Sequence, residues 1–80
     1  MEKSEVLARV KKVIAKVLEI NENEIRNEAN FVFDLGANSQ QSLELVAAFE
    51  EEFDIEMDED GALEMQTVSN AVDFISQYVN

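Results

Sequence analysis

The chain has 80 residues, a net charge of −12, and no cysteine, histidine or proline. A chain of this length is expected to form one small domain over residues 1–80, which hides only about 60% of the surface of its unfolded form and leaves little room for a built-in active site. Without cysteine neither a disulfide framework nor a thiolate metal site can form, and the lack of proline favours helices over a turn-rich sheet.

The first predicted element is an amphipathic helix over roughly residues 5–19. Its apolar positions recur at steps of three and four residues, as on one face of a helix. These positions are Val6, Leu7, Val10, Val13, Ile14, Val17 and Leu18. The basic residues Arg9, Lys11, Lys12 and Lys16 fall between them.

Residues 20–38 are predicted to form a long loop, because asparagines and a glycine interrupt the helical pattern. Isolated apolar residues at Ile20, Ile25, Phe31 and Leu35 would pin this loop to the core. A loop of this length is unusual in a compact domain, so we expect it to have a function or to contain a short helical turn.

A second helix is predicted over residues 39–53. Its apolar side would consist of Leu43, Leu45, Val46, Phe49 and Phe53. Asn38 is a favourable N-cap, worth about 1 kcal/mol over alanine, and Gln41 can complete a capping box. Gly36 allows the chain to turn sharply just before the cap.

The acidic residues 54–60 connect this helix to a short helix predicted near residues 62–65. Thr67 would then cap a last helix. The apolar face of that helix would be Val68, Ala71, Val72, Ile75 and Tyr78 or Val79. With no alternating strand pattern and no repeat, the predicted fold is all-α, a small four-helix bundle of three principal helices and one short helix.

Ser39 presents a lone hydroxyl at the predicted start of the second helix. It cannot act as a hydrolase nucleophile by its own means, because the chain has no imidazole to take its proton and this region has no lysine. A function for Ser39 would therefore be the attachment of another group. The alternative is that Ser39 is only a second N-cap candidate beside Asn38.

The charge is unevenly distributed: residues 1–20 carry a net charge of +2 and residues 21–80 a net charge of −14. This field disfavours nucleic acid and anionic lipid and attracts basic protein surfaces, although acidity can also serve solubility alone. The chain begins with charged residues rather than a signal peptide, and no apolar run approaches the roughly 20 residues of a membrane span. We therefore expect a cytoplasmic protein, and a monomer because like charges repel.

Several segments of the chain, residues 10–14, 31–32, 34–37, 44–46 and 50–57, resemble acyl carrier proteins, and the resemblance extends over essentially the whole length. It implies that a transferase attaches the phosphate of 4′-phosphopantetheine, taken from coenzyme A, to Ser39. It also implies a carrier rather than an enzyme, with acyl groups held as thioesters on the terminal thiol for fatty-acid, lipid or polyketide-type synthesis.

The resemblance further implies a partner-binding face on the second helix. Acidic residues at Glu44, Glu50 and Glu51, with Val46 and Ala47 beside them, would contact basic patches on the enzymes that load and process the cargo. The alternative is an ordinary solvated helix face, since single exposed ion pairs are worth at most about 1 kcal/mol.

A set of apolar residues is predicted to form the core, where burial of each is worth roughly 1.5 to 3 kcal/mol. They are Phe31, Leu45, Phe49, Leu63, Val68, Val72 and Ile75. The resemblance adds that acyl chains can enter between the helices near the second and third.

The sequence also departs from the family pattern. Asn38-Ser39-Gln40 replaces the usual Asp-Ser-Leu, Gln41 and Ser42 stand where a carboxylate and a threonine are common, and Phe33 replaces a residue that is often charged. The helix cap is retained, but we expect partner recognition to change. These departures favour a specialised carrier served by a dedicated transferase or synthase.

Two rival functions follow from the acidity of the chain. Glu56, Asp58, Asp60 and Gly61 match the first, third, fifth and sixth places of a calcium loop, but the twelfth place is Thr67, which cannot supply a bidentate carboxylate. No dedicated metal site is therefore predicted, although weak divalent-ion binding stays possible. A scaffold or nucleic-acid mimic would need only the acidic charge and no modification of Ser39.

Overall fold

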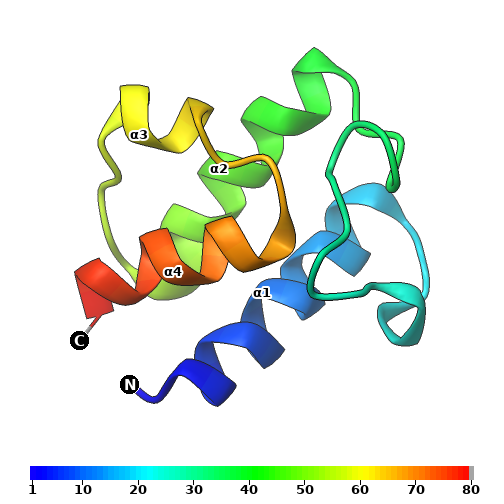
Figure 1. Ribbon diagram of the computed structural model, residues 1–80. Coiled ribbons are helices and arrows are strands. Elements are labelled where there is room, and N and C mark those ends of the chain that lie inside the picture. Colours follow the sequence, from blue (N-terminus) through cyan, green and yellow to red (C-terminus); the bar gives the residue numbers. More distant parts are fainter. Residues whose placement is uncertain (80) are drawn as a thin grey trace.

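The structure, a computed structural model, describes residues 1–79 as four α-helices and one 3₁₀ helix (Figure 1). The α-helices are α1 (Lys3–Leu18), α2 (Ser39–Phe53), α3 (Glu59–Leu63) and α4 (Val68–Val79), and the 3₁₀ helix is η1 (Glu22–Glu24). The predicted bundle of three principal helices and one short helix is confirmed. The short turn expected in the long first loop is η1, whose N-terminus is capped by the side chain of Asn21.

Helix α3 begins three residues before the predicted short helix. Its N-cap is Asp58, whose Oδ2 accepts a hydrogen bond of 3.1 Å from the N–H of Gly61. An aspartate is a strong N-cap, so it starts the helix inside the segment that the sequence suggested was a mere connection. The predicted cap of α4 is confirmed, because the Oγ1 of Thr67 accepts from the N–H of Asn70 at 3.1 Å.

The core lies where α1 packs against both α2 and α4 (Figure 1). The largest fully buried side chains come from these three helices and are Phe49, Ile14, Ile75, Val6, Val10 and Val68. Ile25 and Phe31 of the long loop are also buried, as predicted for residues that pin it. The helical periodicity of the sequence therefore identified the core faces of the principal helices.

Two leucines predicted for the apolar faces are exposed instead. Leu43 is 59% exposed and Leu63 is 62% exposed. The buried stripe of α2 runs from Leu45 to Phe53 in steps of four, and Leu43 lies about 200° around the helix axis from Leu45. In the short α3 it is Ala62 that faces the core, so its neighbour Leu63 is turned about 100° away, toward solvent.

The long loop is tied to the start of α4. Among residues 1–79 there is no β-strand, only an isolated antiparallel bridge between Asn30 and Thr67. The backbone N–H and the hydroxyl of Ser69 both donate to the carbonyl of Asn27, at 2.8 and 2.9 Å. These bonds hold the loop that precedes α2 in a defined place.

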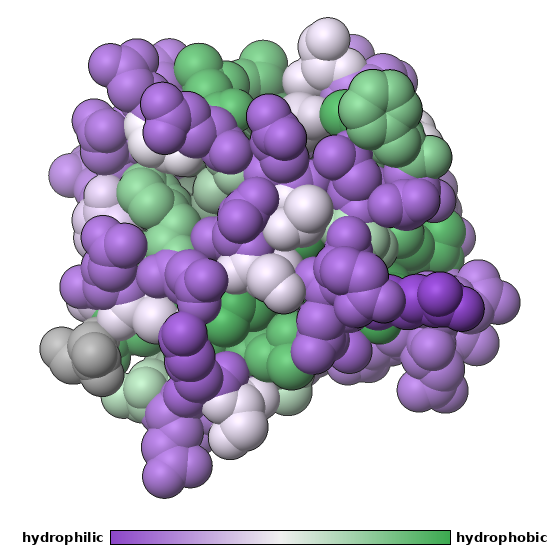
Figure 2. Space-filling model, in the orientation of Figure 1, coloured by the Kyte–Doolittle hydropathy of each residue, from purple (hydrophilic) through white to green (hydrophobic). Residues whose placement is uncertain are grey.

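The surface drawn in Figure 2 is largely hydrophilic, and its hydrophobic parts appear as separate areas between polar side chains. Within residues 1–79, no helix combines the length and the apolar character needed to cross a membrane.

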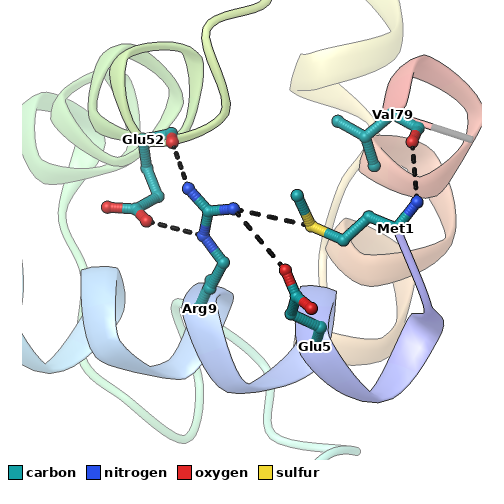
Figure 3. Close-up of polar contacts among 5 residues, drawn as sticks. All are labelled: Met1, Glu5, Arg9, Glu52 and Val79. Atoms are coloured by element: carbon teal, nitrogen blue, oxygen red, sulfur yellow. Dashed lines mark hydrogen bonds and ion pairs between the residues drawn. The ribbon is translucent and has the colours of Figure 1, made fainter.

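Arg9 joins α1 to the last turn of α2 (Figure 3). Its Nε donates to Oε2 of Glu52 and its Nη2 donates to the backbone carbonyl of the same residue, both at 2.7 Å. The guanidinium also lies 4.8 Å from the ring centroid of Phe53, within range of a cation–π interaction. Met1 and Glu5 approach the Nη1 atom more distantly, at 3.6 and 4.0 Å.

We expect Arg9→Ala to lower the free energy of unfolding by about 2 kcal/mol, because charge-assisted hydrogen bonds and a stacked guanidinium are lost together. Urea denaturation followed by circular dichroism measures this change. Lys12→Ala is the control, since Lys12 is exposed on the same helix and should change stability by no more than about 0.5 kcal/mol. Equal effects of the two substitutions would show that the contact with Glu52 is not stabilising.

Candidate functional site

The loop before α2 is organised by two side chains. Oδ1 of Asn30 accepts from the N–H groups of Val32 and Phe33 at 2.9 and 3.0 Å. Asn30 and Asp34 are also joined to each other. Oδ2 of Asp34 accepts a hydrogen bond from the N–H of Asn30 at 2.7 Å, and the N–H of Asp34 donates to the Asn30 carbonyl at 2.9 Å. Asparagine and aspartate stabilise turns in this way, so the segment has a defined conformation although it has no regular helix.

The chain leaves this turn through Gly36, which has a φ of 73°. That left-handed conformation is strained for residues with a Cβ atom, which explains the glycine. The N–H of the next residue, Ala37, donates to the Phe31 carbonyl at 2.8 Å, and Ala37 itself is buried. The start of α2 is thereby fixed against the core.

Helix α2 begins with the predicted capping box. Oδ1 of Asn38 accepts from the N–H of Gln41 at 2.8 Å, and Oε1 of Gln41 accepts from the N–H of Asn38 at 3.1 Å. Asn38 is therefore the N-cap and Ser39 is the first helical residue. The alternative role of Ser39 as the cap is excluded by this geometry, which leaves its exposed side chain available for another purpose.

The start of α2 is a favourable place for an anion. No oxygen among residues 1–79 accepts from the backbone N–H of Ser39 or of Gln40. Free N–H groups and the positive end of the helix dipole together stabilise an exposed negative group by about 0.3 to 1 kcal/mol. Because the chain contains no histidine, any proton on the Ser39 hydroxyl must be taken by another molecule.

A groove of about 320 Å³ opens between α2, the loop before it and α3. Its walls combine buried side chains with exposed ones at the rim. The lining residues are Asn30, Phe31, Val32, Phe33, Ser42, Leu45, Val46, Phe49, Ala62, Leu63, Met65 and Gln66. Ser42 lies three residues after Ser39 on α2, so the two side chains are neighbours on the helix surface, with about 5–6 Å between Cβ atoms.

The comparisons with known proteins agree on one family. Residues 8–75 match the family described as "Phosphopantetheine attachment site". The "Acyl carrier protein" of Caulobacter vibrioides is 46% identical over 74 residues, which cover 92% of this chain and 95% of that protein. The "Acyl carrier protein" of Phenylobacterium zucineum is 47% identical over 74 residues, covering 92% of this chain and 94% of the relative. The chain belongs to the acyl carrier protein family.

Family membership defines the cofactor of this acyl carrier protein, which is covalently attached 4′-phosphopantetheine. Among the residues predicted for an acyl pocket, the structure brings Phe31, Leu45, Phe49 and Leu63 together along the groove. The remaining three, Val68, Val72 and Ile75, lie in the buried core on α4 and do not line it.

The residues predicted to form the partner-binding face of α2 differ in exposure. Glu44, Ala47 and Glu51 are exposed at spacings of three and four residues, so they share one face of α2. Val46 is half-buried and lines the groove. Glu50 is also half-buried, and its Oε2 accepts from the N–H of Met57 at 2.9 Å. Its carboxylate thus fixes the turn after α2, a role that the sequence reading did not assign.

The structure contradicts a calcium loop in this acyl carrier protein. Residues 59–63 are helical where a calcium loop would have to be extended around the ion, and the Asp58 carboxylate is used to cap that helix. Within the described part of the chain, no group of three or more acidic side chains is arranged to hold a metal ion.

Sequence reasoning missed the rim of the groove. Val32, Phe33 and Met65 line it, but none of them was assigned to a pocket from the sequence. The available signal was the apolar pair Val32-Phe33 in an otherwise polar loop that leads into the helix bearing Ser39.

Proposed function

We propose that this chain carries acyl groups as thioesters on a 4′-phosphopantetheine arm attached to Ser39, and that residues 1–80 form one carrier domain. The observation that carries the proposal is the position of Ser39, exposed at the first residue of a capped helix within the matched region. When attached, the group supplies a terminal thiol, which a chain without cysteine cannot provide itself.

The residues around Ser39 fit this group. Its phosphodiester would lie at a helix start where the N–H groups of Ser39 and Gln40 are free among the described residues. Gly36 and the capping box of Asn38 and Gln41 hold that helix start in place. The chain would thus provide a fixed attachment point for a flexible arm. A phosphopantetheinyl transferase would perform the transfer from coenzyme A. We propose no catalytic role for the chain itself.

The intact mass of the chain tests this proposal. Incubation of the unmodified protein with coenzyme A and a broad-specificity phosphopantetheinyl transferase should raise the mass by one phosphopantetheine group. The departures at Asn38 and Gln40 predict slow modification by a general transferase, so transferases from several sources belong in the experiment. Absence of the increase with all of them would count against a carrier function.

We propose that partner enzymes with basic patches bind the exposed α2 face of Glu44, Ala47 and Glu51, and that the carrier acts as a monomer. Because the contribution of one exposed ion pair is small, recognition would depend on several charges acting together and would weaken as salt is added.

The double variant Glu44→Lys/Glu51→Lys should slow modification by the transferase about ten-fold at low ionic strength, since electrostatic steering raises association rates by 10-fold or more. Initial rates at low and high salt measure the effect, which should shrink at high salt. Glu22→Lys/Glu24→Lys is the matched control, because it makes the same change in net charge at exposed residues of η1. Equal rates for the two double variants would remove the proposed face.

The pathway served by the carrier is proposed in general terms as fatty-acid, lipid or polyketide-type synthesis. The replacement of the usual acidic and apolar neighbours of the serine by Asn38 and Gln40 supports a specialised member with dedicated enzymes. Asn38 preserves the helix start, since it makes the cap, but both side chains change the surface that a partner would contact.

A further inference from the structure

Three apolar side chains stand exposed at the rim of the groove beside α2. Phe33 is 88% exposed and Val32 is 53% exposed, yet both line the groove together with the exposed Leu63. Val32 and Phe33 come from the loop before α2, whereas Leu63 comes from α3. The rim therefore presents apolar surface from two separate segments above a floor of buried side chains.

Hydrogen bonds hold the loop backbone that carries Val32 and Phe33. The N–H groups of Val32 and Phe33 both donate to the Asn30 side chain, and the N–H of Phe31 donates to the Gln66 carbonyl at 2.9 Å. These hydrogen bonds hold the backbone of Phe33, while its ring is exposed to solvent and can turn about the side-chain bonds. A large aromatic side chain kept out of the core in this way is a candidate for contact with another apolar group.

We propose that Phe33 is a specificity-determining residue that closes over the acyl chain carried on the arm, so that longer saturated chains are held in the groove and shorter ones are not. This inference rests on the proposed attachment at Ser39. The groove begins beside that residue, because Ser42 lines it and lies one helical turn further along α2. Its floor of Phe31, Leu45 and Phe49 is apolar, which suits an alkyl chain rather than a charged group.

The length dependence follows from the position of Phe33 at the rim rather than in the floor. Each methylene group that leaves water shifts the equilibrium toward the enclosed state about four-fold. A short acyl group can be covered by the floor alone. A longer one fills the groove and reaches the rim, where the ring of Phe33 adds apolar contact.

A fluorescent reporter at the rim tests the inference, since the chain has no tryptophan of its own. Phe33→Trp is converted to the phosphopantetheine form and loaded with butyryl, octanoyl or dodecanoyl groups. We expect the acrylamide quenching constant of the indole to fall by about half from butyryl to dodecanoyl, as methylene groups cover it. Leu43→Trp is the matched control, exposed on α2 but outside the groove, and its quenching should not change.

A second variant reports on the cargo without a new aromatic group. In Phe33→Ser, hydroxylamine should cleave the dodecanoyl thioester about four-fold faster than in the unsubstituted chain, while the butyryl thioester is cleaved at the same rate.

Unchanged quenching in Phe33→Trp for all three acyl groups would overturn the inference. So would a Phe33→Ser variant that is slower only in its reaction with the transferase, which would assign the ring to a partner enzyme instead. Absence of any phosphopantetheine form would remove the proposed function, whereas a loaded carrier with an unresponsive indole would remove this inference alone.

Discussion

Substitution of Ser39 by alanine is expected to abolish the gain in mass on incubation with coenzyme A and a phosphopantetheinyl transferase. The loss should be complete, because the variant has no hydroxyl at the first residue of α2. Intact-protein mass spectrometry after prolonged incubation measures it. Folding should be preserved, because the cap belongs to Asn38 and alanine is the most favourable residue within a helix.

Ser42→Ala is the matched control for this experiment. Ser42 is the nearest other hydroxyl along α2, one turn from Ser39, and it lines the groove. This variant should gain one phosphopantetheine group as the unsubstituted chain does. If the gain were lost in Ser42→Ala and retained in Ser39→Ala, the attachment site would have to be moved by one turn of the helix.

Phe49→Ala is expected to destabilise the fold by about 3–5 kcal/mol, the usual cost of replacing a buried phenylalanine and leaving a cavity. Phe49 is fully buried, and it contributes both to the core and to the floor of the groove. Small domains have free energies of unfolding near the lower end of about 5–15 kcal/mol, so this one change would consume most of the stability. Urea titration followed by circular dichroism measures the loss.

Leu43→Ala separates burial from helix propensity in the same experiment. Leu43 lies on the same helix but is exposed, so its replacement should change the free energy of unfolding by no more than about 0.5 kcal/mol. A Phe49→Ala variant as stable as Leu43→Ala would mean that the groove is already loosely packed around the phenylalanine ring.

The fold could be predicted from the sequence wherever apolar residues repeat along a long helix. The faces of α1 and α4 were recognised in this way, and the capping box of Asn38 and Gln41 located the start of α2. The short α3 was placed too late, because a helix of five residues has too few turns to show a period and its start depends on one cap, Asp58. Leu63 was assigned to the core for the same reason.

The site was predictable in part. Ser39 stands out by its place after a glycine turn and a cap, and its exposure follows from that place. The groove was not predictable, because it depends on how the loop 30–37 lies against α2 and α3, and hydrogen bonds such as the one from Phe31 to Gln66 join residues far apart in the sequence. The inward role of Glu50 was hidden as well, since a carboxylate that binds a backbone N–H seven residues away looks like any other acidic residue.

Because of Arg9, the two ends of α2 are held by different kinds of contact. The guanidinium anchors the helix at Glu52. Ser39 lies at the opposite end, about 20 Å away along the helix axis, where the side-chain hydrogen bonds of the capping box hold the first turn. The two ends of α2 therefore depend on different contacts: the last turn is held by a side chain of α1, and the first turn is held by its own capping box.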